Sequence, residues 1–158
     1  MKKLLLLSAL TLPLIACTEP NGQALNANLG GFTHHFKEKK GGGDWNQIHN
    51  NIGLEYEVNT KNKFRQFVSH EQFKNSFGDR GSLTAAGVKY CGIQKLCVPV
   101  GIGYFTGYKN TTYTPYAGIE YTPIEKVTLR MSVAPAHKEQ GNNTGFAFIG
   151  FKINLLEW

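Results

Sequence analysis

The chain has 158 residues, the length of a single domain, and its 17 basic and 11 acidic residues give a formal net charge of +6. The basic residues are scattered along the sequence, which excludes the continuous basic patch that a nucleic-acid-binding protein needs. We therefore expect no nucleic-acid partner. The mild positive charge fits either solubility or contact with an anionic lipopolysaccharide surface.

The N-terminus has the pattern of a bacterial secretory signal. Two lysines precede an apolar run over residues 4–15 that is too short to span a bilayer as a helix. The run ends in the sequence LIAC, which resembles a lipobox, and in such a signal Cys17 becomes the lipid-carrying N-terminus of the mature chain. The alternative is an ordinary secretory signal that contains a cysteine. Thr18 stands where an aspartate would follow in lipoproteins of the inner membrane, so the lipobox resemblance implies sorting to the outer membrane.

Residues 18–29 are polar and show no apolar face at helical spacing, and they are interpreted as a tether between the lipid and the folded part. We predict a signal peptide at 1–16, a lipidated tether at 17–29 and one folded domain at 30–158.

From residue 30 onward, short segments rich in β-branched and aromatic residues alternate with stretches of turn residues, and no window has helical periodicity. The predicted strands are residues 31–37, 51–58, 63–74, 82–90, 96–108, 113–121, 126–134 and 145–155. Their connections are unequal in length, as in outer-membrane barrels. The predicted fold is all-β, an eight-stranded antiparallel up-and-down β-barrel of the outer-membrane type.

Strict alternation of apolar and polar residues gives each strand two different faces. Residues 127–133 and 52–58 show it most clearly. A membrane barrel turns the apolar face to lipid, whereas a soluble barrel turns it inward, and periodicity does not separate the two. Strands near the ~9–11 residues that cross a bilayer, with Tyr and Trp near their ends, favour a membrane barrel. We expect this barrel to be a monomer. In its lumen, Arg130 is expected to pair with a glutamate, for which the candidates are Glu55, Glu57 and Glu120.

Cys91 and Cys97 are the two cysteines that remain if Cys17 carries lipid. They lie between two predicted strands and outside the reducing cytoplasm, so we predict a disulfide that clamps a hairpin. The alternative, a metal-binding pair, lacks further ligands with suitable spacing, and we expect neither a metal nor a cofactor.

Two parts of the chain resemble one family. FKNS at residues 73–76 is followed by LTAAGVKY at 83–90, and VTLRMSVAP at 127–135 is followed by GFAFIGFKI at 145–153. These segments resemble the outer-membrane lipid A palmitoyltransferase (PagP) family of small eight-stranded barrels. The resemblance implies transfer of a phospholipid acyl chain to lipid A or a similar glycolipid, with outer-membrane phospholipid and lipopolysaccharide as partners.

The same resemblance implies site residues. A histidine of the first strand, either His34 or His35, corresponds to the base, and Ser76 to its hydroxyl partner. Asn75 stands where the family has an aspartate, and an amide orients an imidazole without stabilising its positive charge. Gly87 corresponds to the floor of the acyl-chain pocket, or it relieves strand curvature in a small barrel.

The remaining polar residues have simpler interpretations. Glu71 and Asp79, four residues to either side of Asn75, are alternative carboxylates for the site. His49, His70 and His137 lack ligand spacing and are interpreted as loop or lumen groups.

The sequence is also compatible with two other functions. One is a non-catalytic surface barrel that binds or masks a partner, for example in phage exclusion. The other is a lipid-tethered, lipocalin-like barrel that holds a ligand.

Overall fold

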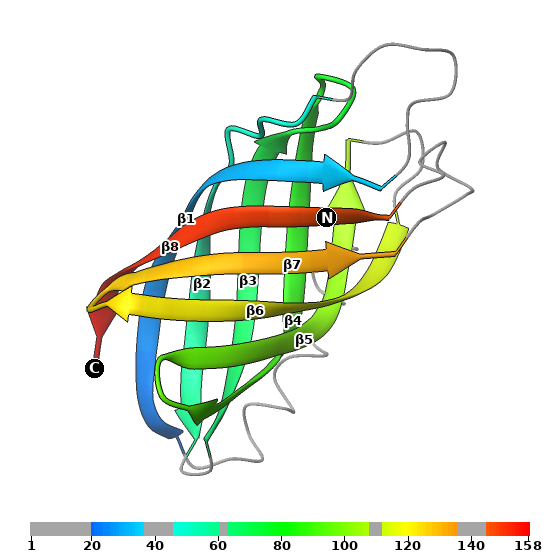
Figure 1. Ribbon diagram of the computed structural model, residues 1–158. Helices are drawn as coiled ribbons and strands as arrows, with labels where there is room; N and C mark the ends of the chain where they lie inside the picture. The colour runs from blue at the N-terminus through cyan, green and yellow to red at the C-terminus, as the bar shows by residue number, and fades with distance from the viewer. Residues whose placement is uncertain (1–19, 37–45, 61–62, 108–111, 136–144) are drawn as a thin grey trace, which may run out of the picture.

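The eight strands of the barrel are each hydrogen-bonded to their sequence neighbours, and β1 pairs with β8 to close the sheet (Figure 1). The computed structural model describes residues 20–36, 46–60, 63–107, 112–135 and 145–158. The strands are β1 (Pro20–His35), β2 (Ile52–Thr60), β3 (Phe64–Lys74), β4 (Arg80–Ile93), β5 (Leu96–Thr106), β6 (Thr112–Ile124), β7 (Val127–Ala134) and β8 (Phe146–Glu157). The predicted antiparallel eight-stranded barrel is confirmed. Among the described residues, no helix is long and apolar enough to cross a membrane.

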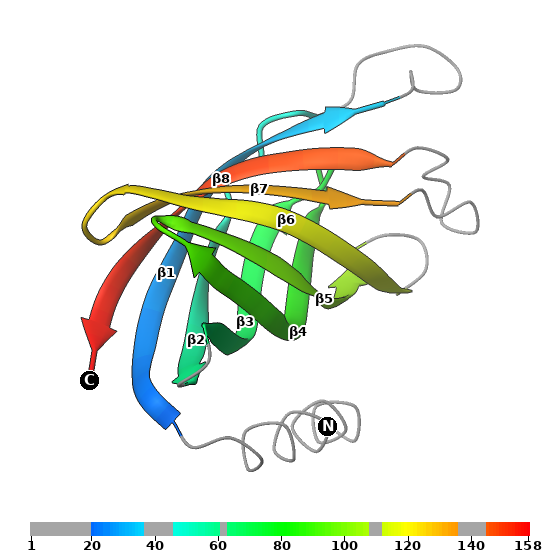
Figure 2. The ribbon, with the colours of Figure 1, turned by 60° about the horizontal axis from the view of Figure 1, so that its bottom comes forward.

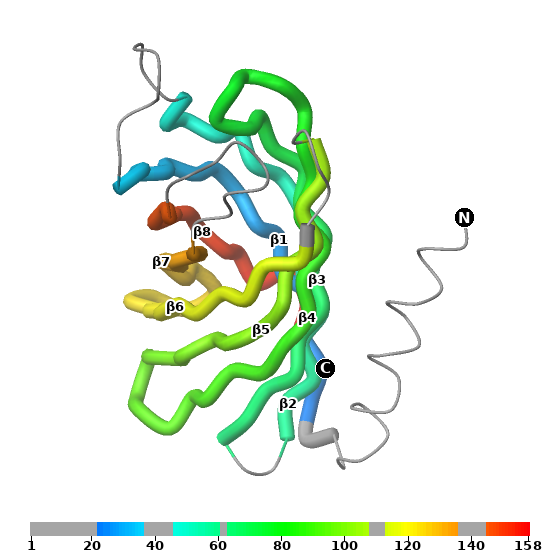
Figure 3. The backbone as a smooth tube through the Cα atoms, turned by 90° about the vertical axis from the view of Figure 1, so that its right-hand side faces the viewer, coloured from blue at the N-terminus to red at the C-terminus, as the bar shows by residue number. Residues whose placement is uncertain are grey.

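The two ends of the barrel differ in their connections. At one end, here called the loop end, the strands are joined through residues 36–51, 75–79, 107–111 and 135–145. At the other, the turn end, residues 61–63, 94–95 and 125–126 make the connections. The start of β1 and the C-terminus lie together at the turn end, where Gln23 and Trp158 exchange two backbone hydrogen bonds (Figure 2). Figure 3 shows the β3–β4 and β4–β5 connections at opposite ends of the barrel.

The start of β1 corrects the predicted tether. Strand β1 begins at Pro20, and its residues from Gln23 to Leu29 pair with β2, so most of the segment predicted as tether belongs to the barrel. Asn26 and Asn28 face the lumen and are buried, whereas the apolar residues that alternate with them over residues 25–29 are less buried and point outward. The prediction failed because a strand that places asparagines on its lumen face has the same polar composition as a loop. The signal peptide and Cys17 lie outside the described residues.

The apolar faces of the strands point outward. On β2, Ile52 and Leu54 are 64% and 53% exposed, whereas Glu55 and Glu57 are 2% and 1% exposed. Strand β7 also has its apolar side chains outside and its charged side chain inside, since Met131 is exposed and Arg130 is buried. A polar lumen and an apolar outer surface are the arrangement of a membrane barrel.

A bulge in β1 changes which residues face the lumen. The pairing of β1 with β8 shifts register between Leu29 and Phe32, and Gly30 adopts a φ of 64°, a left-handed conformation that favours glycine. Asn28 before the bulge and Thr33 after it therefore both face inward, although they are five positions apart. Simple alternation along β1 would have placed them on opposite faces.

Candidate functional site

Ser76 and His35 meet inside the barrel at its loop end. His35 is the last residue of β1, and Ser76 lies in the β3–β4 connection, two residues beyond the end of β3. The His35 Nε2 and Ser76 Oγ atoms are 2.8 Å apart, which is hydrogen-bond distance, and both side chains are buried. His34 points outward from the same strand, where it is exposed beside Phe36. Of the two candidate histidines, the structure brings His35 to Ser76.

Asn75 has a different role from the predicted one. Its side-chain oxygen accepts hydrogen bonds from the backbone N–H groups of Phe77 and Asp79, each at 2.9 Å. Its amide nitrogen donates to the carbonyl of Gly107 at 2.6 Å. These bonds shape the β3–β4 connection and fasten it to the end of β5. The interpretation of Asn75 as the residue that orients the base is replaced by a structural role, that of building the loop that carries Ser76.

A cavity of about 70 Å³ lies below Ser76 in the lumen. Its walls are largely apolar, and they include Phe73, Leu83, Phe105, Phe146 and Phe148. Its polar lining includes Thr33, His49, Asn51, Ser69, Glu71 and Arg130. The cavity is therefore bounded both by aromatic side chains and by polar groups, among them the buried residues Glu71 and Arg130.

Gly87 is not among the residues that line this cavity, and its place at the floor of an acyl-chain pocket stays a prediction. A Cβ atom at Gly87 would lie 2.2 Å from the carbonyl oxygen of Val100 and 3.0 Å from the ring of Phe67. The Phe67 ring packs edge-on near Tyr116, with their centroids 6.3 Å apart, and Tyr116 lines the cavity. Glycine is required at position 87 because β4, β5 and the Phe67 ring approach one another closely there.

Glu71 is the centre of a buried hydrogen-bonded group, here called the Glu71 cluster, which also contains Asn28, Asn51 and Arg130. Its carboxylate accepts hydrogen bonds from Asn28 at 2.8 Å, from Asn51 at 2.5 Å and from Arg130 at 2.9 Å. The predicted pairing of Arg130 with Glu55, Glu57 or Glu120 is therefore wrong in its partner, although the lumen location is right. Glu71 has its acceptor positions occupied by this cluster.

His49 belongs to the site, although its spacing from the other histidines offered no reason to select it. The residue precedes β2, is 5% exposed and lines the cavity together with Ser76. Its Nδ1 is hydrogen-bonded to the carbonyl oxygen of Lys74, and a carbonyl only accepts, so Nδ1 carries the proton and Nε2 is the acceptor. Burial lowers the pKa of His49 below its ordinary value, against a smaller opposing effect of the Lys74 carbonyl, which favours the neutral ring.

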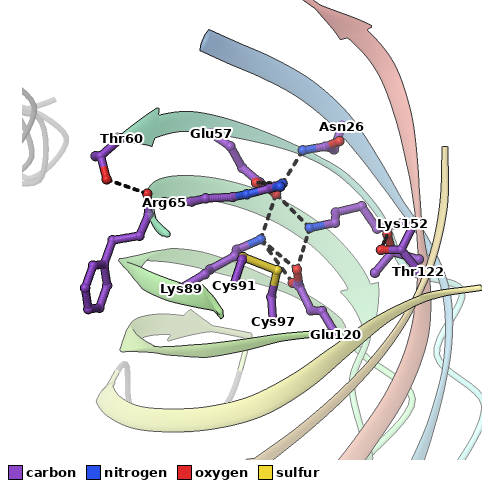
Figure 4. The surroundings of a disulfide bond; sticks show 12 residues. Asn26, Glu57, Thr60, Arg65, Lys89, Cys91, Cys97, Glu120, Thr122 and Lys152 are labelled. Atoms are coloured by element: carbon purple, nitrogen blue, oxygen red, sulfur yellow. Dashed lines mark hydrogen bonds and ion pairs between the residues drawn. A yellow bond between two sulfur atoms is a disulfide. The ribbon is translucent and has the colours of Figure 1, made fainter. Parts of the chain in front are cut away.

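Closer to the turn end, three carboxylates and two ammonium groups fill the lumen in what we call the charge layer. It consists of Glu55, Glu57, Glu120, Lys89 and Lys152, and all five side chains are buried. Each lysine Nζ lies 2.6–3.0 Å from oxygens of all three glutamates. Figure 4 shows Lys89 and Lys152 pointing at the carboxylates of Glu57 and Glu120. The carboxylate oxygens come within 4.8 Å of one another, as in a cation site, but the two ammonium groups take the place of a cation.

Comparison with known proteins finds similarity of structure. No model of a protein family and no curated protein matches the sequence. The structure is similar to that of Ail, the attachment invasion locus protein of Yersinia pestis, with a TM-score of 0.58 and 10% identity over 89% of this chain and 100% of that chain. It is also similar to the de novo designed protein TMB2.3, with a TM-score of 0.56 and 13% identity over 85% of this chain and 96% of that one.

A second crystal structure of Ail, in complex with the heparin analogue sucrose octasulfate, has a TM-score of 0.51 and 11% identity over 89% of this chain and 100% of that chain. The chain has the fold of a small outer-membrane barrel. At these identities the likeness is one of fold, and the bound sulfated sugar belongs to Ail.

The predicted disulfide is present in this outer-membrane-type barrel. Cys91 and Cys97 are bonded to each other across the β4–β5 hairpin, at the turn end (Figure 4). The disulfide lies at the opposite end of the barrel from Ser76. Its role is therefore to hold the β4–β5 hairpin together.

Proposed function

We propose that this chain is a bacterial outer-membrane barrel that transfers an acyl chain from a phospholipid to lipid A or a similar glycolipid. The observation that carries the proposal is the 2.8 Å contact between His35 Nε2 and Ser76 Oγ in a buried position at the loop end. In the proposed reaction, His35 accepts the hydroxyl proton of Ser76 as Oγ attacks the ester carbonyl. It then returns this proton to the departing lysophospholipid alcohol, which leaves the acyl chain on Oγ. A hydroxyl group of the glycolipid attacks this ester next, while His35 accepts its proton and passes it to the Ser76 Oγ that departs. The resemblance of residues 73–90 to the lipid A palmitoyltransferases supports the same assignment.

The outer surface supports placement in a membrane. Large apolar side chains are exposed on the outward faces of all eight strands. Aromatic pairs lie toward both ends, Tyr104 with Tyr113 near the loop end and Phe64 with Tyr90 at the turn end. Outer-membrane barrels carry such aromatic girdles at the two interfaces and keep their short turns on the periplasmic side. In this placement Ser76 faces the outer leaflet, and a lipid on Cys17 would anchor the chain from the periplasmic side.

The size of the cavity sets a condition on the reaction. Sites for drug-sized ligands measure roughly 300–1,000 Å³, well above the 70 Å³ found here. A long acyl chain therefore enters the lumen only if aromatic side chains turn aside. Phe73 and Phe146 are the natural candidates, because both pack edge-on against Phe105 in the cavity wall.

The second candidate function is a non-catalytic surface barrel that binds a partner through its loop end. It is favoured by the commitment of Asn75 to loop structure and by the polar Glu71 cluster below the cavity, which suits an acyl chain poorly. The Ail complex gives an example of a sulfated-sugar ligand on a barrel of this fold.

Mass spectrometry of lipid A tests the proposal. The chain is expressed in a Gram-negative host that lacks its own lipid A palmitoyltransferase, and the lipid A is compared with that of the host alone. We expect an added acyl mass, and we expect Ser76→Ala and His35→Ala to lose it by a factor of about 100 or more. His34→Ala is the matched control, since it removes the neighbouring imidazole that points outward, and it should leave the added mass in place.

Folding of each variant is verified by heat-modifiable gel migration of outer-membrane fractions. Unchanged lipid A with a folded wild-type barrel would reject acyl transfer to lipid A and leave the non-catalytic barrel. Equal activity of the Ser76→Ala variant and the wild type would reject the assigned residues.

A further inference from the structure

Three buried polar atoms around the cavity have no hydrogen-bond partner among the residues that the structure describes. They are His49 Nε2, Asn51 Oδ1 and Arg130 Nη1. All three residues line the cavity, and all three are more than nine-tenths buried. A buried polar atom without a hydrogen-bond partner is costly in free energy. Three such atoms around one cavity therefore indicate that a ligand in the cavity supplies their partners.

The orientation of each atom is set by the other end of its side chain. Asn51 donates its amide N–H to Glu71, which fixes Oδ1 as the remaining acceptor, and Arg130 binds the same carboxylate through Nη2, which leaves Nη1 as a donor. His49 donates Nδ1–H to the Lys74 carbonyl, which leaves Nε2 as an acceptor. The cavity therefore offers two acceptors and one donor.

We propose that this cavity is a binding site for a neutral diol, in which one hydroxyl group bridges Asn51 Oδ1 and Arg130 Nη1 and a second hydroxyl group donates to His49 Nε2. A hydroxyl group donates once and accepts at the same time, which matches the acceptor of Asn51 and the donor of Arg130, two residues that both bind the Glu71 carboxylate. The ligand is neutral because Glu71 and Arg130 already neutralise each other, and an added buried charge would lack a counter-ion.

The apolar wall distinguishes this ligand from water. Phe105, Phe146 and Phe148 give a carbon skeleton a surface to pack against, which water molecules alone would not use. The cavity volume of about 70 Å³ compares with roughly 30 Å³ for one water molecule in the liquid, so it holds a small end-group and not a whole lipid. Glycerol headgroups and sugar rings both present such neighbouring hydroxyl groups. The site is independent of whether Ser76 reacts.

The test uses the full chain, reconstituted in phosphatidylcholine nanodiscs and labelled with ¹⁵N in its histidine rings, with glycerol as the probe. We expect the ring signals of His49 to shift in a saturable manner. Those of His70 should not move, because His70 is exposed on the outer face and bonded to Thr84. Nanodiscs that contain phosphatidylglycerol or lipopolysaccharide, without added glycerol, then identify which lipid supplies the diol.

Matched variants separate binding from folding. Asn51→Ala and Asn28→Ala each remove one amide from Glu71, but Asn28 does not line the cavity. We expect Asn51→Ala to weaken glycerol binding about tenfold, the effect of one lost hydrogen bond, and Asn28→Ala to leave it nearly unchanged. His49→Gln, which keeps an amide near the position of Nε2, should retain binding that His49→Phe loses.

Two outcomes would overturn the proposal. One is the absence of any His49 shift with glycerol and with both lipids, which would mean that the cavity holds ordered water only. The other is an equal loss of binding in Asn51→Ala and Asn28→Ala, which would mean that the Glu71 cluster acts through folding alone.

Discussion

Asn75 stands at the position where the resembled family carries an aspartate, and its hydrogen bonds explain why an amide suits this chain. A carboxylate could accept the bonds from Phe77 and Asp79, but it could not donate to the carbonyl of Gly107. The amide is fully buried, so a carboxylate there would face that carbonyl without a proton to share.

We therefore predict that Asn75→Asp destabilises the barrel by about 1–3 kcal/mol, the cost of a buried polar group left without its partner. Urea unfolding in detergent micelles, followed by gel migration, measures the change. Asp79→Asn is the control, because it makes the reverse exchange at an exposed position of the same connection. A gain of acyl transfer without loss of stability in Asn75→Asp would show that the aspartate belongs to a working site here.

His49 gives a second prediction at the scale of one residue, in the dependence of stability on pH. Its pKa in the folded state is lowered from the ordinary value of 6.5 by burial, so the unfolded chain binds the proton more readily. The stability that the neutral ring contributes is present above pH 6.5 and is lost as the pH falls below it. The charged or titratable groups of the same site are His35, Glu71 and Arg130.

We expect the free energy of unfolding to fall between pH 7 and pH 5 by a larger amount in the wild type than in His49→Gln, which does not titrate. Unfolding in urea at several pH values measures both curves, and the lowering of the His35 pKa by burial, present in both proteins, cancels in the difference. The smaller effect of His49 on the His35 pKa is lost with the imidazole and adds to the same difference. Parallel curves would mean that His49 keeps an ordinary pKa in the folded barrel.

At the scale of the element, the bulge in β1 determines which histidine enters the lumen. Gly30 has a left-handed φ and open space where a Cβ would stand, so a substitution there costs backbone energy alone. If the bulge were removed, the alternation after it would reverse, and His34 rather than His35 would face Ser76.

Gly30→Val is predicted to destabilise the barrel by about 1–2 kcal/mol, whereas Gly30→Asn should cost much less, since asparagine tolerates the left-handed region. The activity assay on the two variants adds a second measurement, because a strand that relieves the strain by losing its bulge also loses the His35–Ser76 contact. Equal stability of the two variants would show that β1 adapts without the left-handed residue.

The elements also show how far the sequence alone reaches. Segments rich in β-branched and aromatic residues between turn residues predicted β2 to β8, and alternation of apolar and polar residues is clearest on β2 and β7. The same rule missed the start of β1, where asparagines face the lumen, and it could not detect the bulge, which depends on pairing with β8. Ser76 and the candidate histidines followed from the family resemblance. His49 and the Glu71–Arg130 pair did not, because only the closed barrel brings together residues so far apart in the sequence.

At the scale of the whole molecule, buried charge fills the lumen in two places. Three residues of the Glu71 cluster line the cavity, and the charge layer lies between this cluster and the turn end. A polar lumen must satisfy every buried charge, and here the carboxylates are met by ammonium and guanidinium groups from other strands. These contacts connect β4 and β8 to both β2 and β6, and they connect β3 to β7 across the barrel interior, in addition to the hydrogen bonds between neighbouring strands.

The charge layer gives the last prediction. Lys89 is fully buried and touches all three glutamates, so Lys89→Met leaves three carboxylates to share Lys152. Removing one partner of a buried ion pair typically costs about 3–5 kcal/mol, and we expect a loss of that order in the free energy of unfolding. Adding Glu120→Gln should restore much of it. The wild-type layer has one carboxylate more than it has ammonium groups, Lys89→Met raises that excess to two, and the double variant returns it to one. Coupled neighbours deviate from additivity in this way. Lys74→Met, at an exposed position on the outer side of β3, serves as the control and should change stability little. If Lys89→Met were as stable as the control, the charge layer would be no more than a filling of the lumen, and the barrel would depend on its strand pairing alone.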